Sequence, residues 1–485
     1  MNQIKRAAVW LLCLSMAVLS LQAYAAETED NDIKLSGEYG AWEQIAKSIA
    51  EEYIDDTLDA EKIMKMGVSN MLDGSDEMLV LLLKKTLESL DDYSTFYTAE
   101  EYREYLSNLN RTFFGVGLEL KKTGQYAEIT GFVEENSLAE RTGFQVGDRI
   151  ICINGSDVSS KSLNEIKNML MGELNTTITI TVLRGDEYID IIATRTEVKE
   201  TTVMGEILPG NIGYVRIVSF SQDTAAEFYE VEKLFDQNGV TKVIMNLRDN
   251  PGGLVVSAVK IAQEIVPKGK IVDVKFRQPE YDTVYYSELP STNKNYMVLV
   301  NENTASAAEI LASAMQDSGV GKLVGEQTFG KAVVQRTYPL NNGSVYKLTT
   351  AQYVTRNGHK INQKGLTPDV KVSNYTEKID TGLYTPMDRV NRYALGSYGD
   401  TVKGAKERLY MLGIYKGKVD DKVFTEELQE AIKEYQYVNN LSASGVLDIV
   451  TQQKIENTFS KLQRVVDVQM QTAYEMFGGN IDNLQ

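Results

Sequence analysis

Residues 296–311, YMVLVNENTASAAEIL, join an apolar run to a polar turn and then to a second apolar run. The first run, Tyr296 to Val300, has the length and composition of a buried strand. A helix is predicted to begin near Ala305, directly after the turn. The same order occurs upstream, where Lys242 to Leu247 predicts a buried strand and a helix follows as far as Ile265. Residues from about 200 to 375 therefore predict an α/β layer, with loops gathered at the strand ends where sites are usually built.

Ser306 lies in this turn and has two interpretations. Within Ser306-Ala307-Ala308-Glu309 it forms a capping box, in which serine and glutamate satisfy free main-chain N–H groups. Alternatively, its hydroxyl projects from a sheet edge beside the helix dipole and the Ala307 N–H, which suit the oxyanion of an acyl-transfer reaction. Capping alone would explain most serines at such a turn, so the second interpretation requires a base.

Two side chains are candidates for that base. His359, the single histidine, lies in a polar turn, and a triad histidine needs an orienting partner and a fixed pose. Lys331 lies in Phe329-Gly330-Lys331-Ala332-Val333-Val334, which predicts an apolar strand, and a lysine must lose its water to become neutral near pH 7. An edge-strand lysine that reaches the solvent is the alternative. Gln335, four residues on, is expected on the same face, where its amide could hold the lysine amine.

The composition restricts the possible partners and cofactors. The chain of 485 residues has 50 basic and 68 acidic side chains, which give a formal net charge of −18. This charge argues against nucleic acid or anionic lipid as the main partner, because both need a basic surface. Two cysteines and one histidine exclude a disulfide framework and metal sites built from several histidines or cysteines. No metal or organic cofactor is expected, and any hydrolysis must proceed almost without imidazole.

The first 25 residues are predicted to be a secretory signal peptide. Lys5 and Arg6 precede an apolar stretch, Ala7 to Leu21, and Ala23-Tyr24-Ala25 supplies small residues for cleavage. An uncleaved membrane anchor is the alternative. The expected location is therefore the cell envelope, in the periplasm or on the extracellular face. Residues 26–110 are predicted to form a short leader followed by a helical region, the latter from its helical periodicity.

Short strands and glycine turns characterise residues 111–196. Ser137 to Phe144 predicts one helical turn, and Gln145 to Gly155 predicts a turn, a buried strand and a tight hairpin. This pattern resembles a PDZ domain, a β-barrel-like fold with two helices. The resemblance implies that an extended peptide is taken up as an added strand and that a glycine loop holds its C-terminal carboxylate. The matching loop is Phe114-Gly115-Val116-Gly117, although its glycines could also serve only a tight turn.

Three helical runs follow a predicted linker over 379–399. Ala431 to Gln436, with Leu441 to Asp448 behind it, resembles a peptidoglycan-binding-like three-helix domain over 400–460. Its opening and its turn are altered, to Ala405-Lys406 and Asp420-Asp421, so it could instead be a spacer or docking module that does not bind glycan. In the last segment, 461–485, Lys461 to Phe477 suits a terminal amphipathic helix and a homodimer contact.

Residues from about 40 to 375 resemble the carboxyl-terminal processing peptidases, or tail-specific proteases, of the bacterial exported type. The motifs occur in the family's order and are Leu90-Asp91-Asp92-Tyr93-Ser94, the inserted PDZ domain, Leu247-Arg248-Asp249-Asn250-Pro251-Gly252-Gly253, Ser306-Ala307-Ala308-Glu309, Gly330-Lys331-Ala332-Val333-Val334-Gln335 and Lys364-Gly365-Leu366-Thr367-Pro368-Asp369. The resemblance implies a protease core over 197–378, with Ser306 as nucleophile, Lys331 as general base and Gln335 orienting the lysine. It also implies an oxyanion hole formed by the main-chain N–H groups of Gly252 and Ala307.

The sequence thus predicts a multidomain α+β and α/β protein, with an N-terminal helical region, an inserted PDZ domain, an α/β serine protease core and a C-terminal three-helix domain. The expected function is that of an exported serine endopeptidase that recognises the C-terminal tails of polypeptides, with peptidoglycan as a further candidate partner. The main alternative is a peptide-binding scaffold of little or no activity, docked at the cell wall. A cell-wall hydrolase has little support. Cleavage of the signal peptide would leave Cys152 as the one cysteine, and this residue with one histidine cannot supply the usual zinc ligands or cysteine–histidine pair of such an enzyme.

Overall fold

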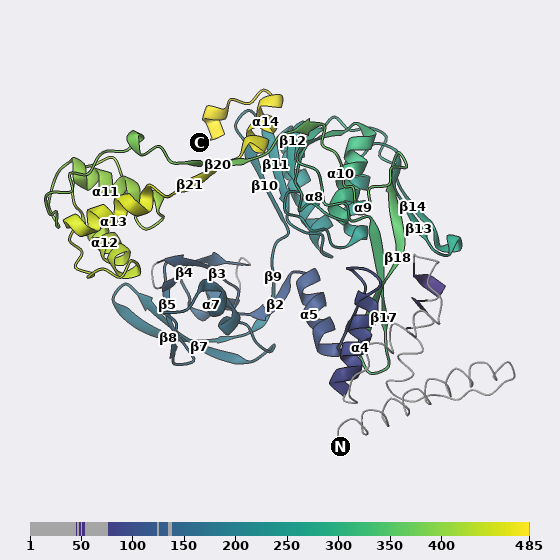
Figure 1. The fold of residues 1–485 in the computed structure, drawn as a ribbon, viewed down its shortest axis with the longest axis horizontal. Coiled ribbons are helices and arrows are strands. Elements are labelled where there is room, and N and C mark those ends of the chain that lie inside the picture. The colour runs from purple at the N-terminus through teal and green to yellow at the C-terminus, as the bar shows by residue number, and fades with distance from the viewer. Residues whose placement is uncertain are drawn as a thin grey trace, which may run out of the picture. The chain divides into compact units, whose positions relative to one another are not determined.

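The computed structural model describes residues 45, 48–49, 51–53, 76–123, 126–133 and 138–484 (Figure 1). They belong to two compact units, one made of residues up to Ala99 with 335–350, the other of 100–334 with 351–485. The predicted signal peptide and much of the predicted N-terminal helical region lie outside the described residues. Among the described residues, no helix has the length and apolar character that crossing a membrane requires.

The first unit combines a helix with a small sheet. It contains α4 (Asp76–Glu88), β1 (Thr95–Tyr97), most of β17 (Val333–Pro339) and the first part of β18 (Val345–Thr355). β1 pairs antiparallel with β18, and β17 pairs with β18 as a hairpin. The buried hydrophobic residues of this unit are Ile45, Ile49, Tyr53, Leu83, Leu87, Phe96, Leu340, Tyr346 and Leu348.

The second unit contains the α/β layer predicted for residues 200–375. Its six-stranded sheet has the order β10 (Val203–Leu208), β11 (Ile212–Ile217), β12 (Lys242–Asn246), β15 (Asn295–Val300), β16 (Gly321–Gly325) and β19 (Val370–Lys371). β10 is antiparallel to β11, and the other neighbours are parallel. Helices α8 (Thr224–Gln237), α9 (Val255–Ile265) and α10 (Ala307–Ser318) follow β11, β12 and β15. The loops that join these strands to their helices therefore meet at one edge of the sheet.

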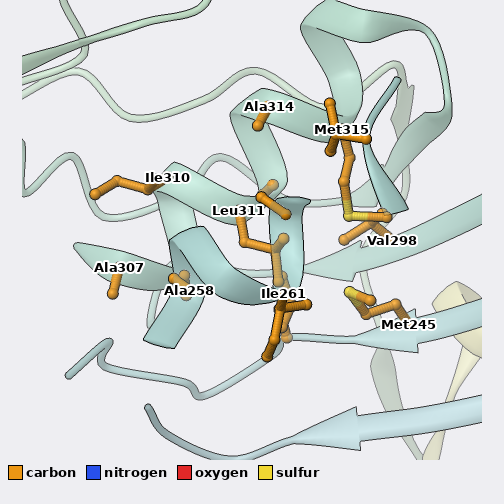
Figure 2. Close-up of a cluster of buried hydrophobic side chains, with 14 of the residues drawn as sticks. Met245, Ala258, Ile261, Val298, Ala307, Ile310, Leu311, Ala314 and Met315 are labelled. Carbon is orange, nitrogen blue, oxygen red and sulfur yellow. The ribbon is translucent and has the colours of Figure 1, made fainter. Parts of the chain in front are cut away.

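Side chains alternate between the two faces of this sheet. On β12, Val243 and Met245 belong to the core under the helices, whereas Ile244 belongs to a separate core on the other face. Figure 2 shows residues of the helix-side core, among them Met245, Val298, Ala258, Ile261, Ala307, Ile310, Leu311, Ala314 and Met315. Because Ala307 is fully buried in this core, the packing fixes the first turn of α10 directly after Ser306.

The other face of the sheet is covered by the C-terminal helix α14 (Val468–Met476). Ala473 and Tyr474 are fully buried there, in the same core as Ile244. The prediction of one helix from Lys461 to Phe477 was wrong, because β21 (Gln463–Val466) first pairs antiparallel with β20 (Tyr375–Lys378). The apolar residues that suggested a homodimer contact thus pack within their own chain.

An antiparallel sheet completes the core of the second unit. β13 (Gly269–Phe276) pairs with β14 (Thr283–Ser287) on one side and with the second part of β18 on the other. The short helix η1 (Pro279–Tyr281) joins β13 to β14.

The PDZ segment has its own sheet and core. Five strands follow the order β3 (Leu118–Thr123), β4 (Tyr126–Phe132), β5 (Arg149–Ile153), β7 (Thr177–Arg184) and β8 (Glu187–Thr194), and β6 (Ser156–Asp157) pairs with β5. The helices are α6 (Leu138–Thr142), within the helical turn predicted from Ser137 to Phe144, and α7 (Leu163–Leu170). A two-stranded ribbon of β2 (Thr112–Gly115) and β9 (Thr196–Lys199) frames the domain, and α5 (Ala99–Leu109) precedes it.

The three helices predicted near the C-terminus are α11 (Asp400–Met411), α12 (Glu426–Val438) and α13 (Ile449–Phe459). They share a core that also buries Met387, a residue of the predicted linker. A short helix, η2 (Thr381–Leu383), precedes them, and η3 (Ile481–Leu484) ends the described chain. β20 precedes these helices in the sequence and β21 follows them, and the two strands pair with each other. The three helices are therefore an insertion between two paired strands.

Candidate active site

The turn that carries Ser306 is fixed to the loop that follows β12. The Thr304 hydroxyl donates to the Leu247 carbonyl at 2.9 Å, and the Ala305 N–H donates to the Asn250 carbonyl at 2.9 Å. β12 and β15 are neighbouring parallel strands, so both loops leave the same edge of the sheet. This edge is where the sequence predicted the functional residues.

Ser306 has a main-chain conformation that residues with side chains rarely adopt. Its φ is 57° and its ψ is −117°, a sparsely populated region in which a residue stores about 1–3 kcal/mol of strain. Helix α10 begins at the next residue, and Ser306 remains partly exposed. A sharp strand-to-helix turn of this kind presents a serine hydroxyl at the sheet edge, as nucleophilic catalysis requires.

Gly252 approaches the Ser306 turn too closely for any side chain. Its φ is 98°, and a Cβ there would lie 2.8 Å from the Ser306 Cβ and 2.9 Å from the Ala307 nitrogen. The two predicted oxyanion donors are therefore neighbours of the serine. The Ala307 N–H is the first of α10, where main-chain N–H groups have no acceptor within the helix. The Gly252 N–H donates to Asn250 Oδ1 at 2.9 Å.

The buried carboxylate of Glu309 accepts four hydrogen bonds. Oε2 accepts the main-chain N–H groups of Ser306 and Lys331, both at 2.9 Å. Oε1 accepts the Thr328 hydroxyl at 2.6 Å and the Gly330 N–H at 2.8 Å. Burial raises the pKa of Glu309, and these hydrogen bonds act in the opposite direction. Glu309 thus caps the serine turn, as one interpretation of the sequence predicted, and also joins it to the Lys331 segment.

Tyr353 joins the same two residues through their carbonyl groups. Its hydroxyl lies 3.0 Å from the carbonyl oxygens of both Ser306 and Lys331. The side chain is almost completely buried. Burial, together with the nearby charge of Glu309, raises the pKa of the hydroxyl well above its ordinary value, so it stays protonated and donates.

Lys331 is partly buried and precedes β17 instead of lying inside it. The strand begins at Val333. Before that point, the Ala332 N–H donates to Asn362 Oδ1 at 3.0 Å and the Ala332 carbonyl accepts the Tyr353 N–H at 3.0 Å. The prediction of a lysine within an apolar strand was wrong, because side-chain acceptors hold the main chain here before strand pairing begins.

Gln335 belongs to the first unit, since the boundary between the units falls between Val334 and Gln335. Its side-chain amide donates to Thr349 Oγ1 at 3.2 Å within the β17–β18 hairpin. The role of Gln335 in orienting Lys331 therefore stays a prediction.

His359 lies far from the serine turn. Its side chain is 70% exposed, and its Nδ1 lies 4.0 Å from the carboxylate of Asp317. Asp317 is ten residues after Ala307 in α10, which places the two ends of the helix about 15 Å apart. Thr355 and Asn357 also donate to that carboxylate, at 2.7 and 2.9 Å. The geometry gives no support to a histidine-based triad.

The predicted carboxylate-binding loop, Phe114 to Gly117, leads from β2 into β3. Gly117 has a φ of 74°, a left-handed conformation that glycine adopts without cost. The Phe114 carbonyl accepts the N–H of Gly172, just beyond the end of α7, at 3.1 Å. The loop thus lies between α7 and β3, and β3 is an edge strand of its sheet.

A separate polar cavity of about 360 Å³ lies at the carboxyl edge of the six-stranded sheet. Neither Ser306 nor Lys331 lines it. Its lining residues carry both signs of charge and are Arg216, Asn246, Arg248, Asp249, Asn301, Glu302, Glu326, Asn374, Asp467 and Gln469. No group of three or more histidine, cysteine, aspartate or glutamate side chains in the described part of the chain is arranged to hold a metal ion.

Sequence reasoning missed Tyr353 and Asn250 and gave Glu309 only a capping role. Tyr353 lies in a mostly buried strand, where tyrosine is an ordinary core residue. Asn250 belongs to the motif from Leu247 to Gly253, yet nothing in this motif indicates which of its polar side chains turns inward. The spacing of three residues from Ser306 was the available signal for Glu309.

Comparison with known proteins places these features in a family. Three family models match, namely "Peptidase family S41" over 211–372, "PDZ domain" over 133–184 and "Putative peptidoglycan binding domain" over 398–455. The "Carboxy-terminal processing protease CtpA" of Bacillus subtilis is 32% identical over 404 residues, which cover 82% of this chain and 85% of that protein. A "Probable CtpA-like serine protease" of Staphylococcus epidermidis is 32% identical over 406 residues, 83% and 80% of the two chains.

A solved structure, the photosystem II D1 C-terminal processing protease, matches 70% of this chain and 93% of its own, with 25% identity and a TM-score of 0.44. The fold and the family models define a serine peptidase whose α/β core is accompanied by a PDZ domain. The chain belongs to peptidase family S41, among the CtpA-like carboxy-terminal processing proteases. The family resemblance and the mixed α/β multidomain fold predicted from the sequence are thus confirmed.

Proposed function

We propose that this protein is an exported serine endopeptidase that cleaves polypeptides near their C-termini with a dyad of Ser306 and Lys331. The main support is the arrangement around Glu309, where the N–H groups of both residues lie 2.9 Å from one carboxylate oxygen. Ser306 also occupies a strained turn at a sheet edge. Lys331 is the base in this proposal, since His359 is exposed and lies near Asp317, at the other end of α10.

In the proposed reaction, the neutral amine of Lys331 removes the proton from Ser306 Oγ as this oxygen attacks the scissile carbonyl carbon. The carbonyl π electrons move to the oxygen, which becomes an oxyanion. When the oxyanion collapses, the C–N bond breaks and the leaving amine takes the proton from the Lys331 ammonium. Water, deprotonated by Lys331, then attacks the carbonyl carbon of the Ser306 ester. When the bond from this carbon to Ser306 Oγ breaks, the Lys331 ammonium returns the proton to Oγ and the new C-terminus is released.

The oxyanion in this proposal accepts hydrogen bonds from the N–H groups of Ala307 and Gly252. The first begins α10 and benefits from the positive end of the helix dipole. The second is bonded to Asn250 Oδ1 in this structure. Gly252 must therefore turn from that side chain, or share its hydrogen, when the tetrahedral intermediate forms.

We infer that the PDZ domain selects the substrate by its C-terminal tail. β3 is an edge strand and contacts α7, so an extended peptide can pair with β3 beside this helix. The loop from Phe114 to Gly117 opens at the same end and would bind the carboxylate. For the three-helix domain, the family match supports a location at the cell wall and contact with peptidoglycan.

The purified protein, incubated with an unstructured polypeptide that ends in an apolar tail, tests this function by mass spectrometry of the products. Cleavage by the wild type that disappears in Ser306→Ala and in Lys331→Ala supports the dyad. Lys364→Ala, at an exposed lysine in a nearby loop, is the matched control and should retain activity. Tail binding without cleavage in the wild type would instead favour a peptide-binding scaffold. A substrate amidated at its C-terminus should be cut more slowly if the tail is recognised.

A further inference from the structure

We propose that Tyr353 and Glu309 are positioning residues, which together hold the nucleophile and the base of the dyad at their reacting distance. This inference rests on the proposed Ser306–Lys331 mechanism. It assigns a role to two buried polar side chains that take no part in the proposed reaction steps or in the proposed binding of substrate.

The first half of the arrangement acts on the N–H groups. Ser306 and Lys331 are 25 residues apart in the sequence, yet both donate to Oε2 of Glu309. Glu309 is fully buried, and its other oxygen is occupied by Thr328 and Gly330. With all four donors in place, the carboxylate has no freedom to rotate without breaking hydrogen bonds in a site that excludes water.

The second half acts on the carbonyl groups of the same two residues. The Tyr353 hydroxyl lies 3.0 Å from each carbonyl oxygen, so its one hydrogen is shared between them. Tyr353 belongs to β18, which pairs with β13 at this position, opposite Val274. This pairing anchors Tyr353 to β13, and the Tyr353 N–H also donates to the Ala332 carbonyl, next to Lys331.

The two contacts together hold both main-chain polar groups, the N–H and the carbonyl, of Ser306 and of Lys331. Without these hydrogen bonds, the distance between Ser306 and Lys331 would depend on two separate loops. Because a displacement of about 1 Å between reacting groups can cost about a hundredfold in rate, this restraint bears directly on turnover. A phenylalanine at position 353 would fill nearly the same volume, so packing alone does not explain why this residue carries a hydroxyl.

Tyr353→Phe in the full-length protein is the decisive variant. We expect kcat to fall about tenfold or more while KM stays within about twofold, because substrate contacts are unchanged. The rate at which a fluorophosphonate labels Ser306 should fall in the same proportion, since this reaction needs the serine and its base but no peptide binding. Tyr474→Phe is the matched control, because Tyr474 is equally buried and its hydroxyl also donates to a main-chain carbonyl, that of Pro209, at 2.8 Å.

Glu309→Gln provides the second variant. Glutamine replaces one of the two carboxylate oxygens with an NH2 group, which cannot accept a hydrogen bond. Two of the four donors that now bind Glu309 therefore lose their acceptor. In molecules that fold, as judged by thermal unfolding and circular dichroism, kcat should again fall with KM little changed. The positioning role is overturned if Tyr353→Phe has the kcat and labelling rate of Tyr474→Phe, or if its loss is in KM. If Ser306→Ala or Lys331→Ala retains full activity, the proposed dyad fails and not merely its positioning.

Discussion

Arg248 and Asp467 form a two-point ion pair, with Nη1 to Oδ1 at 2.6 Å and Nη2 to Oδ2 at 2.8 Å. Arg248 belongs to the loop that also contains Gly252, and Asp467 immediately precedes α14. Gln469 and Asn246 complete the surroundings of the guanidinium. The C-terminal segment, which returns to the core after the three-helix insertion, is thus bonded to the loop that supplies a proposed oxyanion donor.

Breaking this pair should destabilise the fold measurably. Asp467→Asn leaves the largely buried guanidinium of Arg248, 13% exposed, without its carboxylate. Because Asp467 itself is 40% exposed, we expect the free energy of unfolding to fall by about 1–2 kcal/mol, less than for a fully buried pair. Urea denaturation would measure this. Glu288→Gln is the control, since its pair with Lys268 is well exposed on both sides and should contribute much less. Equal losses in the two variants would contradict the prediction.

The contribution of Asp467 should depend on pH. Burial would raise its pKa, but hydrogen bonds from Arg248 and from the Met470 N–H, together with the Arg248 charge, lower the pKa overall. A carboxyl whose pKa is lowered by folding stabilises the protein above its unfolded pKa, about 3.9, and loses this effect as the pH falls through the folded value. The stability difference between wild type and Asp467→Asn should therefore be full at pH 7 and shrink below about pH 4. A difference that grows on acidification would show that another group is responsible.

The packing of α14 on its own sheet can be tested with Tyr474→Ala. Tyr474 is fully buried in the core that it shares with Ile244. Truncating an aromatic residue at such a site costs about 3–5 kcal/mol. Tyr410→Ala, at a tyrosine of α11 that is 53% exposed, should cost far less. If this surface instead joined two copies of the chain, the wild-type unfolding midpoint would rise with protein concentration, and we expect no such rise.

The core strands could be predicted because their signal is local. Lys242 to Leu247 and Tyr296 to Val300 are apolar runs of strand length followed by polar turns. The bounds of β12 and β15 agree with these runs to within one residue. Ser306 could be found for the same reason, since the strand, the turn and the helix that position it are contiguous. Such features depend on residues that are neighbours in the sequence.

The missed features depend on partners far away in the sequence. β21 has four mostly exposed residues and forms only because β20 lies opposite, with Val466 paired to Tyr375. Tyr353 acquires its position beside Ser306 through the pairing of β18 with β13. Periodicity within a window cannot register contacts of this range, so the helix predicted over β21 and the omission of Tyr353 have one physical origin.

Recognition of a C-terminal carboxylate by the PDZ loop predicts a difference between two glycine variants. Gly117→Ala and Gly155→Ala place a side chain at nearly the same φ, 74° and 75°, so each adds about 1–2 kcal/mol of strain. Both should therefore lower stability alike. In a Ser306→Ala background, only Gly117→Ala should weaken binding of a peptide with a free C-terminus, by about fivefold or more. Fluorescence anisotropy with free and amidated peptides would measure this, and equal binding by both variants would place the carboxylate elsewhere.

The identity of the base predicts how activity depends on pH and on His359. With Lys331 as base, kcat/KM should increase as the pH rises above neutrality, since the amine acts only when it is neutral. His359→Asn should leave that profile and the rate within about twofold of wild type, because the imidazole is exposed and lies beside Asp317 at the far end of α10. Steady-state kinetics between pH 5 and pH 10 would provide both measurements. A profile that rises through a single group near pH 6.5 and disappears in His359→Asn would assign the proton transfer to the histidine, and Lys331 would then be left with a structural role.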